Sequence, residues 1–196
     1  MAKHTAYDKG TVESRLVHEY NADLLGAPFK IVLVDSVTEE YCSATGEKLK
    51  TVIPDMSGLL RKAAFYRAIM PRKLVGEEIK FLRNAISYKA KQMADALEMT
   101  PEHYSRVENG SKRLMPDTEK LLRVIAITKM FEDKIVSSAL LKKMSQLLNL
   151  KIEGAWDPSE MIELRLEHRK QEEQEETVGP ANDNADWVPF AQARVC

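Results

Sequence analysis

The stretch Thr100-Pro101-Glu102-His103-Tyr104-Ser105-Arg106-Val107-Glu108-Asn109-Gly110 decides how the middle of this 196-residue chain folds, because it carries the signals of both ends of a short helix. The Thr100 hydroxyl can cap a helix, and Pro101 suits the first helical position because its φ is already helical. Gly110 is typical of the residue that follows a helix. We therefore predict a helix over residues 100–109.

This predicted helix has an apolar and a polar face. Tyr104 and Val107 are three residues apart and are expected to face inward. Each outward side chain on its own is typical of an ordinary surface residue. Only the neighbouring helices can indicate that these side chains have a function. The outward candidates for reading DNA bases are Pro101, Glu102, His103, Ser105 and Arg106.

Two more short helices are predicted just upstream, over residues 76–86 and 89–97. Only Glu98 and Met99 separate the second from the helix that begins at Thr100. Two helices joined by so tight a turn can form a helix-turn-helix, whose second helix enters the DNA major groove. Simple bundle packing is the alternative.

Polar and basic residues flank these helices. Cationic side chains and backbone N–H groups at such positions bind phosphate oxygens and supply affinity that does not depend on sequence. The candidate phosphate-binding residues are Lys89, Lys91, Thr100, Asn109, Ser111, Lys112 and Arg113.

The charge is distributed unevenly along the chain. The whole chain has a net charge of −1, but residues 58–129 hold 15 basic and 8 acidic residues, and residues 153–186 hold 3 basic and 11 acidic residues. The basic middle favours a nucleic-acid partner. The acidic part suggests that residues 160–186 lie over the basic surface and compete with phosphate, which deletion of everything after Pro158 would test.

The rest of the chain is expected to be mainly helical. We predict an irregular start over residues 1–25, and strands over 29–34 and 49–53 with a turn at 43–46 between them. A helix capped by Asp55 or Ser57 is predicted to run to about residue 70. Further helices are predicted from residue 117 or 118, through 131–150, and over 159–176, with residues 154–158 as a linker or a helix start. Residues 177–196 are expected to be disordered.

At this point the residues resemble a known family. Leu82-Arg83, Met93-Ala94, Leu97 and the segment 100–110 are similar to the helix-turn-helix of the phage-repressor or Cro-like (XRE) transcriptional regulators. The resemblance covers about residues 76–127. It implies that Glu102, His103 and Arg106 face bases, that Asn109, Lys112 and Arg113 hold phosphates, and that Glu108 braces the fold.

The chain departs from this family in two places. Ala90 stands where the family usually has a Gln that contacts phosphate, so Lys89 or Lys91 is expected to replace that contact. Glu98 stands where a Gly is usual in the turn, which predicts an altered or mildly strained turn.

A weaker resemblance extends upstream. Tyr41-Cys42-Ser43-Ala44-Thr45-Gly46-Glu47 followed by Ile53-Pro54 is similar to the layout of MqsA-type antitoxins, which place a zinc knuckle before the helix-turn-helix. Thr45 replaces the second Cys of that knuckle. Because a structural zinc site needs about four Cys or His ligands, we expect no metal here and no other cofactor.

The predicted fold is therefore mostly α. It comprises an N-terminal β-hairpin region (1–54), a five-helix XRE-type DNA-binding domain (55–130, core 76–127), a helical extension (131–176) and a disordered acidic tail (177–196). The apolar pattern of residues 121–150 has two interpretations. These residues either belong to the hydrophobic core or form a dimer interface.

The predicted function is sequence-specific regulation of transcription, by a homodimeric repressor that reads a palindromic site in double-stranded DNA. The alternative is an antitoxin-like protein that binds a toxin or another protein partner and regulates its own promoter. We expect that the protein is not an enzyme, because the sequence has no glycine elbow or phosphate loop. It has no apolar run of the ~18 residues that a membrane span needs and no signal peptide, and its two Cys, 154 positions apart, suit a reducing cytoplasm.

Overall fold

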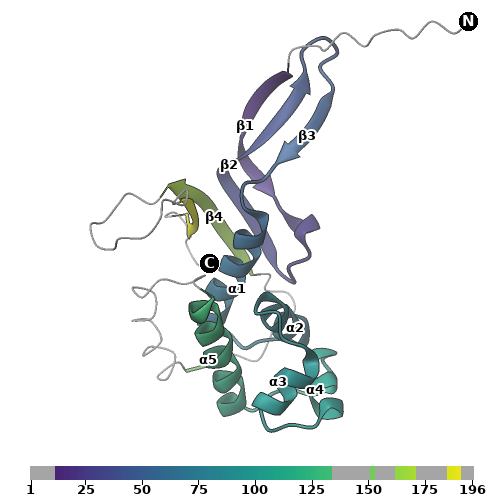
Figure 1. Ribbon diagram of the computed structural model, residues 1–196, viewed down its shortest axis with the longest axis vertical. Coiled ribbons are helices and arrows are strands. Elements are labelled where there is room, and N and C mark those ends of the chain that lie inside the picture. Colours follow the sequence, from purple (N-terminus) through teal and green to yellow (C-terminus); the bar gives the residue numbers. More distant parts are fainter. Residues whose placement is uncertain (1–11, 134–150, 153–161, 171–184, 191–196) are drawn as a thin grey trace, which may run out of the picture. The chain divides into compact units, whose positions relative to one another are not determined.

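The computed structural model describes residues 12–133, 151–152, 162–170 and 185–190. Within these residues it contains five α-helices and a five-stranded sheet (Figure 1). The fold is therefore α/β, and the prediction of a mostly α protein is wrong. The expected helix over 131–150 lies outside the described residues from position 134 on, as does the linker at 154–158.

The sheet combines strands from both ends of the chain. Its strands are β1 (Val12–Asn21), β2 (Lys30–Cys42), β3 (Lys48–Val52), β4 (Glu163–Lys170) and β5 (Ala185–Pro189). Their order is β1-β2-β4-β5, and β3 also pairs with β2. The pairs β1/β2, β2/β3 and β4/β5 are antiparallel.

Strands β2 and β4 run in the same direction, which makes the sheet mixed. The Lys30 N–H donates to the Ile162 carbonyl at 3.0 Å, and the His168 N–H donates to the Ser36 hydroxyl at 2.8 Å. From the first hydrogen bond to the second, the residue numbers increase along both strands, as they do in parallel neighbours.

The two predicted strands are confirmed. Strand β2 begins where expected, and its β-branched and leucine run over residues 31–34 is buried, as in a strand covered on both faces. It continues to Cys42, well beyond the predicted end at 34. The turn at 43–45 leads into β3.

The structure contains three strands that the sequence analysis missed. Strand β1 occupies the expected irregular start; none of its side chains is buried, so no apolar alternation marks it. Strand β4 replaces the predicted helix over 159–176. Its buried residues Leu164 and Leu166 are two apart, which places both on one face of a strand but on different faces of a helix. Strand β5 lies in the tail expected to be disordered.

The helices agree well with prediction. They are α1 (Met56–Ile69), α2 (Gly76–Ala85), α3 (Ala90–Ala96), α4 (Pro101–Glu108) and α5 (Pro116–Glu132), with a 3₁₀ turn η1 (Asp23–Leu25). The Thr100 hydroxyl caps α4 by accepting a hydrogen bond from the His103 N–H at 3.2 Å. The last helix begins slightly earlier than expected, with Met115 as its N-cap.

The chain forms two compact units. The first comprises the described parts of 1–21, 32–55 and 165–196, and the second those of 22–31 and 56–164. Within the second unit α1 packs on α5 and α2, while α4 packs on α2 and α3. No helix in the described part of the chain combines the length and apolar character needed to cross a membrane.

Trp187 of β5 anchors the C-terminal strands within the first unit. Its side chain is fully buried, its ring lies 4.9 Å from that of His168, and its indole N–H donates to the Asp55 carbonyl at 3.1 Å. The described parts of the segment 160–186, residues 162–170 and 185–186, therefore belong to or adjoin strands of the sheet. Deleting everything after Pro158 would remove two strands, so that deletion cannot isolate an effect on phosphate binding.

We predict that Trp187→Ala lowers the free energy of unfolding by about 3–5 kcal/mol, because it removes a fully buried aromatic side chain and leaves a cavity. Urea denaturation followed by circular dichroism measures this. The control Leu24→Ala truncates a side chain that is 94% exposed and should change stability by less than about 0.5 kcal/mol. Equal effects of the two variants would contradict the anchoring role of Trp187.

Candidate nucleic-acid interface

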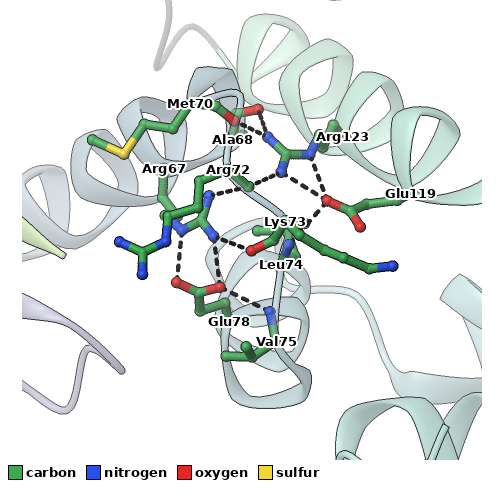
Figure 2. A network of polar contacts seen from close by, with 10 residues as sticks. All are labelled: Arg67, Ala68, Met70, Arg72, Lys73, Leu74, Val75, Glu78, Glu119 and Arg123. Carbon is green, nitrogen blue, oxygen red and sulfur yellow. Dashed lines mark hydrogen bonds and ion pairs between the residues drawn. The ribbon is translucent and has the colours of Figure 1, made fainter. Parts of the chain in front are cut away.

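A buried arginine–carboxylate pair fixes the start of α2. Arg67 of α1 is fully buried and donates to both carboxylate oxygens of Glu78, at 2.6 and 2.7 Å (Figure 2). It also donates to the carbonyls of Arg72 and Lys73, at 3.1 and 2.8 Å. The Glu78 carboxylate in turn accepts from the Val75 N–H at 2.9 Å and so caps its own helix.

A second buried pair attaches α5 to the same segment. Arg123 donates to Glu119 at 2.8 Å and to the carbonyls of Ala68, Met70 and Arg72 (Figure 2). These carbonyls lie at or beyond the end of α1, where the helix itself offers no partners. Burial lowers the pKa of the Arg123 guanidinium, and Glu119 opposes that shift.

Glu119 completes the connection by accepting from the Leu74 N–H at 3.0 Å. The two pairs, Arg67–Glu78 and Arg123–Glu119, are called the arginine network below. It joins α1, the linking residues 70–75, α2 and α5 into one body. No sequence pattern predicted this network, because an arginine or glutamate that becomes buried cannot be distinguished from an exposed one by residue type.

A third pair attaches α2 to α4. Arg83 donates to both carboxylate oxygens of Glu108, at 2.6 and 3.2 Å, and to the Tyr88 carbonyl at 2.7 Å. The hydrogen bond to Glu108 is the main reason that the pKa of Arg83 is raised. Glu108 therefore braces α4 against α2, as the resemblance implied.

Gly76 permits a very close approach of α4 to the start of α2. A Cβ at this position would lie 2.5 Å from the Glu108 carbonyl oxygen, 2.6 Å from that of Val107 and 2.8 Å from the Gly110 nitrogen. All three atoms belong to the backbone, so no side-chain rotation can make room.

The turn between α3 and α4 keeps the geometry that usually requires glycine. Glu98 has φ 54°, in the left-handed region. The Met99 N–H donates to the Ala94 carbonyl and the Glu98 N–H to the Asp95 carbonyl, which is the Schellman pattern. The predicted strain is thus located at Glu98, while the turn itself is preserved.

The structure places the predicted base-reading residues on one outward surface of α4. Pro101, Glu102, Ser105 and Arg106 are exposed and His103 is half-buried. On the opposite side, Tyr104 and Val107 are buried, and burial followed by the nearby Glu108 charge raises the pKa of Tyr104. Helix α4 therefore presents these polar side chains to solvent while it packs on α2 and α3 (Figure 1).

The predicted phosphate-binding residues fall into two groups. Lys89 and Lys91 are exposed at the start of α3, and Thr100 is the exposed N-cap of α4. The others follow α4, where the Asn109 side chain accepts from the Ser111 N–H at 3.0 Å. Asn109, Lys112 and Arg113 line a cavity of about 740 Å³.

This cavity, called the basic pocket below, also contains cations that the sequence analysis did not single out. Lys73, before α2, and Lys80, within α2, lie on its wall together with the start of α2. Their only signal in the sequence was membership of the basic segment 58–129. Among the described residues no ion-pair partner is found for either ammonium group.

In the part of the chain that the structure describes, no group of three or more His, Cys, Asp or Glu side chains is arranged to hold a metal ion. The Cys42 thiol has its pKa lowered chiefly by a hydrogen bond with Thr45, the residue at the position of the second knuckle cysteine.

Comparison of the chain with protein-family models, with curated proteins and with solved structures finds no match.

We predict that Gly76→Ala lowers the free energy of unfolding by about 1–3 kcal/mol, because the added methyl group overlaps the backbone of α4. Urea denaturation measures the change. The neighbouring variant Glu77→Ala, at an exposed position, is the control and should be nearly neutral. A stable Gly76→Ala protein would show that α2 and α4 do not approach so closely.

We also predict that Glu98→Gly raises the free energy of unfolding by about 0.5–1 kcal/mol, since glycine relieves the left-handed strain but loses more entropy on folding. Glu98→Ala removes the same carboxylate while keeping the Cβ, and it should give no such gain. Equal gains from both variants would point to the carboxylate and against backbone strain.

Proposed function

We propose that this protein is a sequence-specific DNA-binding regulator of transcription that inserts α4 into the major groove. The observation that carries the proposal is the α3–turn–α4 unit, in which Tyr104 and Val107 anchor α4 and its polar side chains remain exposed. Such rigid presentation is what reading of base edges requires. The resemblance of the sequence to the XRE family supports the same role.

In this proposal Arg106 reads bases most strongly. Its guanidinium is exposed on α4, and a guanidinium can donate two parallel hydrogen bonds to guanine O6 and N7. Glu102, His103 and Ser105 contribute to base recognition from the same helix. Pro101 contacts the groove at the start of the helix.

Phosphate binding falls to the residues around α4. Lys89 and Lys91 hold one stretch of backbone beside α3, and Asn109, Lys112 and Arg113 hold another at the rim of the basic pocket. This arrangement gives affinity through release of counterions and therefore a steep dependence on salt.

The regulator acts as a homodimer and represses transcription by occupying a palindromic operator. Two copies of α4 would then read half-sites about one turn of B-DNA apart, roughly 34 Å.

We expect Arg106→Ala to flatten the sequence preference, at a cost of about 1–3 kcal/mol for the preferred operator and little for unrelated DNA. Lys112→Ala should instead weaken all DNA similarly and reduce the slope of log K against log salt by about 0.9. Selection from a random DNA library identifies the operator, and fluorescence anisotropy titrations at several salt concentrations compare the variants.

Lys50→Ala is the matched control, since it removes one positive charge from β3 and lies far from α4 in the sequence. It should leave both preference and salt slope unchanged. A library selection that enriches no sequence would refute the proposed function, and indistinguishable behaviour of the Arg106 and Lys112 variants would refute the division between base reading and phosphate binding.

A further inference from the structure

Strand β1 forms one edge of the sheet in the part of the chain that the structure describes. Among the described strands it pairs only with β2, although it is ten residues long. The N–H and C=O groups along the other side of such a strand are a template for pairing with a further strand. Two of its apolar side chains are well exposed, Val12 at 53% and Leu16 at 64%.

Strand β3 is also an edge strand, but its charge differs from that of β1. Strand β3 also pairs only with β2 among the described strands, but it carries Lys48 and Lys50 within five residues. Lysine on an edge strand opposes pairing between copies, because the like charges meet. On β1, Arg15 lies beside Glu13 at 3.2 Å, so residues 12–16 carry no net charge.

We propose that β1 pairs antiparallel with β1 of a second copy of this chain, about a two-fold axis beside Ser14. In this register Val12 lies opposite Leu16 of the second copy, and Glu13 lies opposite Arg15 of the second copy. Both contacts occur twice because of the symmetry. Apolar residues thus meet apolar ones and each carboxylate meets a guanidinium, which are favourable cross-strand pairs.

Other registers are worse. In an antiparallel pair, two residues that lie directly opposite each other have their side chains on the same face of the sheet. A two-fold axis perpendicular to the sheet must therefore place one residue opposite its own copy, since an axis between two residues would pair side chains from different faces. Axes beside Glu13 or Arg15 place identical charges opposite each other, and an axis beside Leu16 places Glu13 opposite Glu19. An axis beside Val17 would cross the irregularity that the strand has between Val17 and Glu19. The register beside Ser14 avoids both problems.

This surface supplies the second copy that the proposed homodimer needs, but it rests on the geometry of β1 and not on DNA binding. Its test therefore contains no DNA. Dimerisation through another surface would overturn this inference and leave the proposed function standing, whereas a monomeric wild type would also refute the homodimer and leave only DNA binding by α4.

The decisive experiment exchanges the charges of Glu13 and Arg15 in the full-length chain. Glu13→Arg alone and Arg15→Glu alone each create two like-charge pairs across the interface, and each should weaken dimerisation about tenfold or more. An equimolar mixture of the two variants restores opposite charges at both cross-strand pairs and should dimerise nearly as tightly as the wild type. Sedimentation velocity over a concentration series measures the dissociation constants.

The mixture separates the interface from effects inside one strand, since Glu13 and Arg15 also contact each other within the chain. Each mixed subunit still has like charges at 13 and 15 within its own strand, so only pairing between copies can restore association. Lys50→Glu, a charge reversal on β3, is the control and should dimerise like the wild type. A monomeric wild type, single variants that dimerise as tightly as the wild type, or a mixture that stays monomeric would each overturn the proposal.

A cross-link fixes the register independently. In a protein with Cys42→Ser and Cys196→Ser, Ser14→Cys should form a disulfide-linked dimer under mild oxidation, since residue 14 faces its own copy. Lys50→Cys, exposed on β3, should not. Equal cross-linking of both variants, or of neither, would overturn the register.

Discussion

The helical unit depends on two arginines that are buried where the backbone turns between α1 and α2. Removing two guanidinium groups from water costs several kcal/mol each unless every donor finds a partner. Arg67 and Arg123 find them in Glu78, Glu119 and the carbonyls at the end of α1 and in the linking residues. The same carbonyls would otherwise be left without donors in the interior. The guanidinium groups and the backbone carbonyls thus satisfy each other, while Glu119 Oε2 is buried without a hydrogen-bond partner among the described residues. Together these contacts hold the start of α2.

Helix α2 in turn determines the position of α4. Arg83 and Gly76 bring the end of α4 against α2, one through paired charges and the other through the absence of a side chain. Because these pairs neutralise charges inside the fold, they must be subtracted before the charge of the segment 58–129 is interpreted. Three arginines and three glutamates of the segment 58–129 are paired inside the fold, which leaves 12 basic and 5 acidic residues for the rest of that segment. The three internal pairs cancel, so the excess of seven positive charges comes from the other residues of that segment.

Local signals predicted the helices, and long-range pairing explains what they could not predict. Thr100, Pro101 and Gly110 act within one or two turns, so the sequence alone located α4 almost to the residue. The outward face of α4 followed from the spacing of Tyr104 and Val107. Strand β4 instead depends on β2, more than a hundred residues away, and its charged sequence resembles that of a solvated helix. Strand β5 pairs with β4, and the Gly, Pro, Asn and Asp residues around it are typical of a disordered tail. Lys73 and Lys80 were missed for the same reason, because only the fold brings them to the basic pocket.

The sheet is assembled from segments synthesised at very different times. Strand β2 is complete at Cys42, but its neighbour β4 follows only after residue 162 and the buried Trp187 later still. Contacts among α1 to α5 span far shorter separations and can form as soon as residue 132 is available. Strands β1, β2 and β3 can pair once residue 52 is available, but the sheet is completed only after the helices have been synthesised. Until β4 is available, the apolar run of β2 lacks its neighbour on that side and is exposed to aggregation.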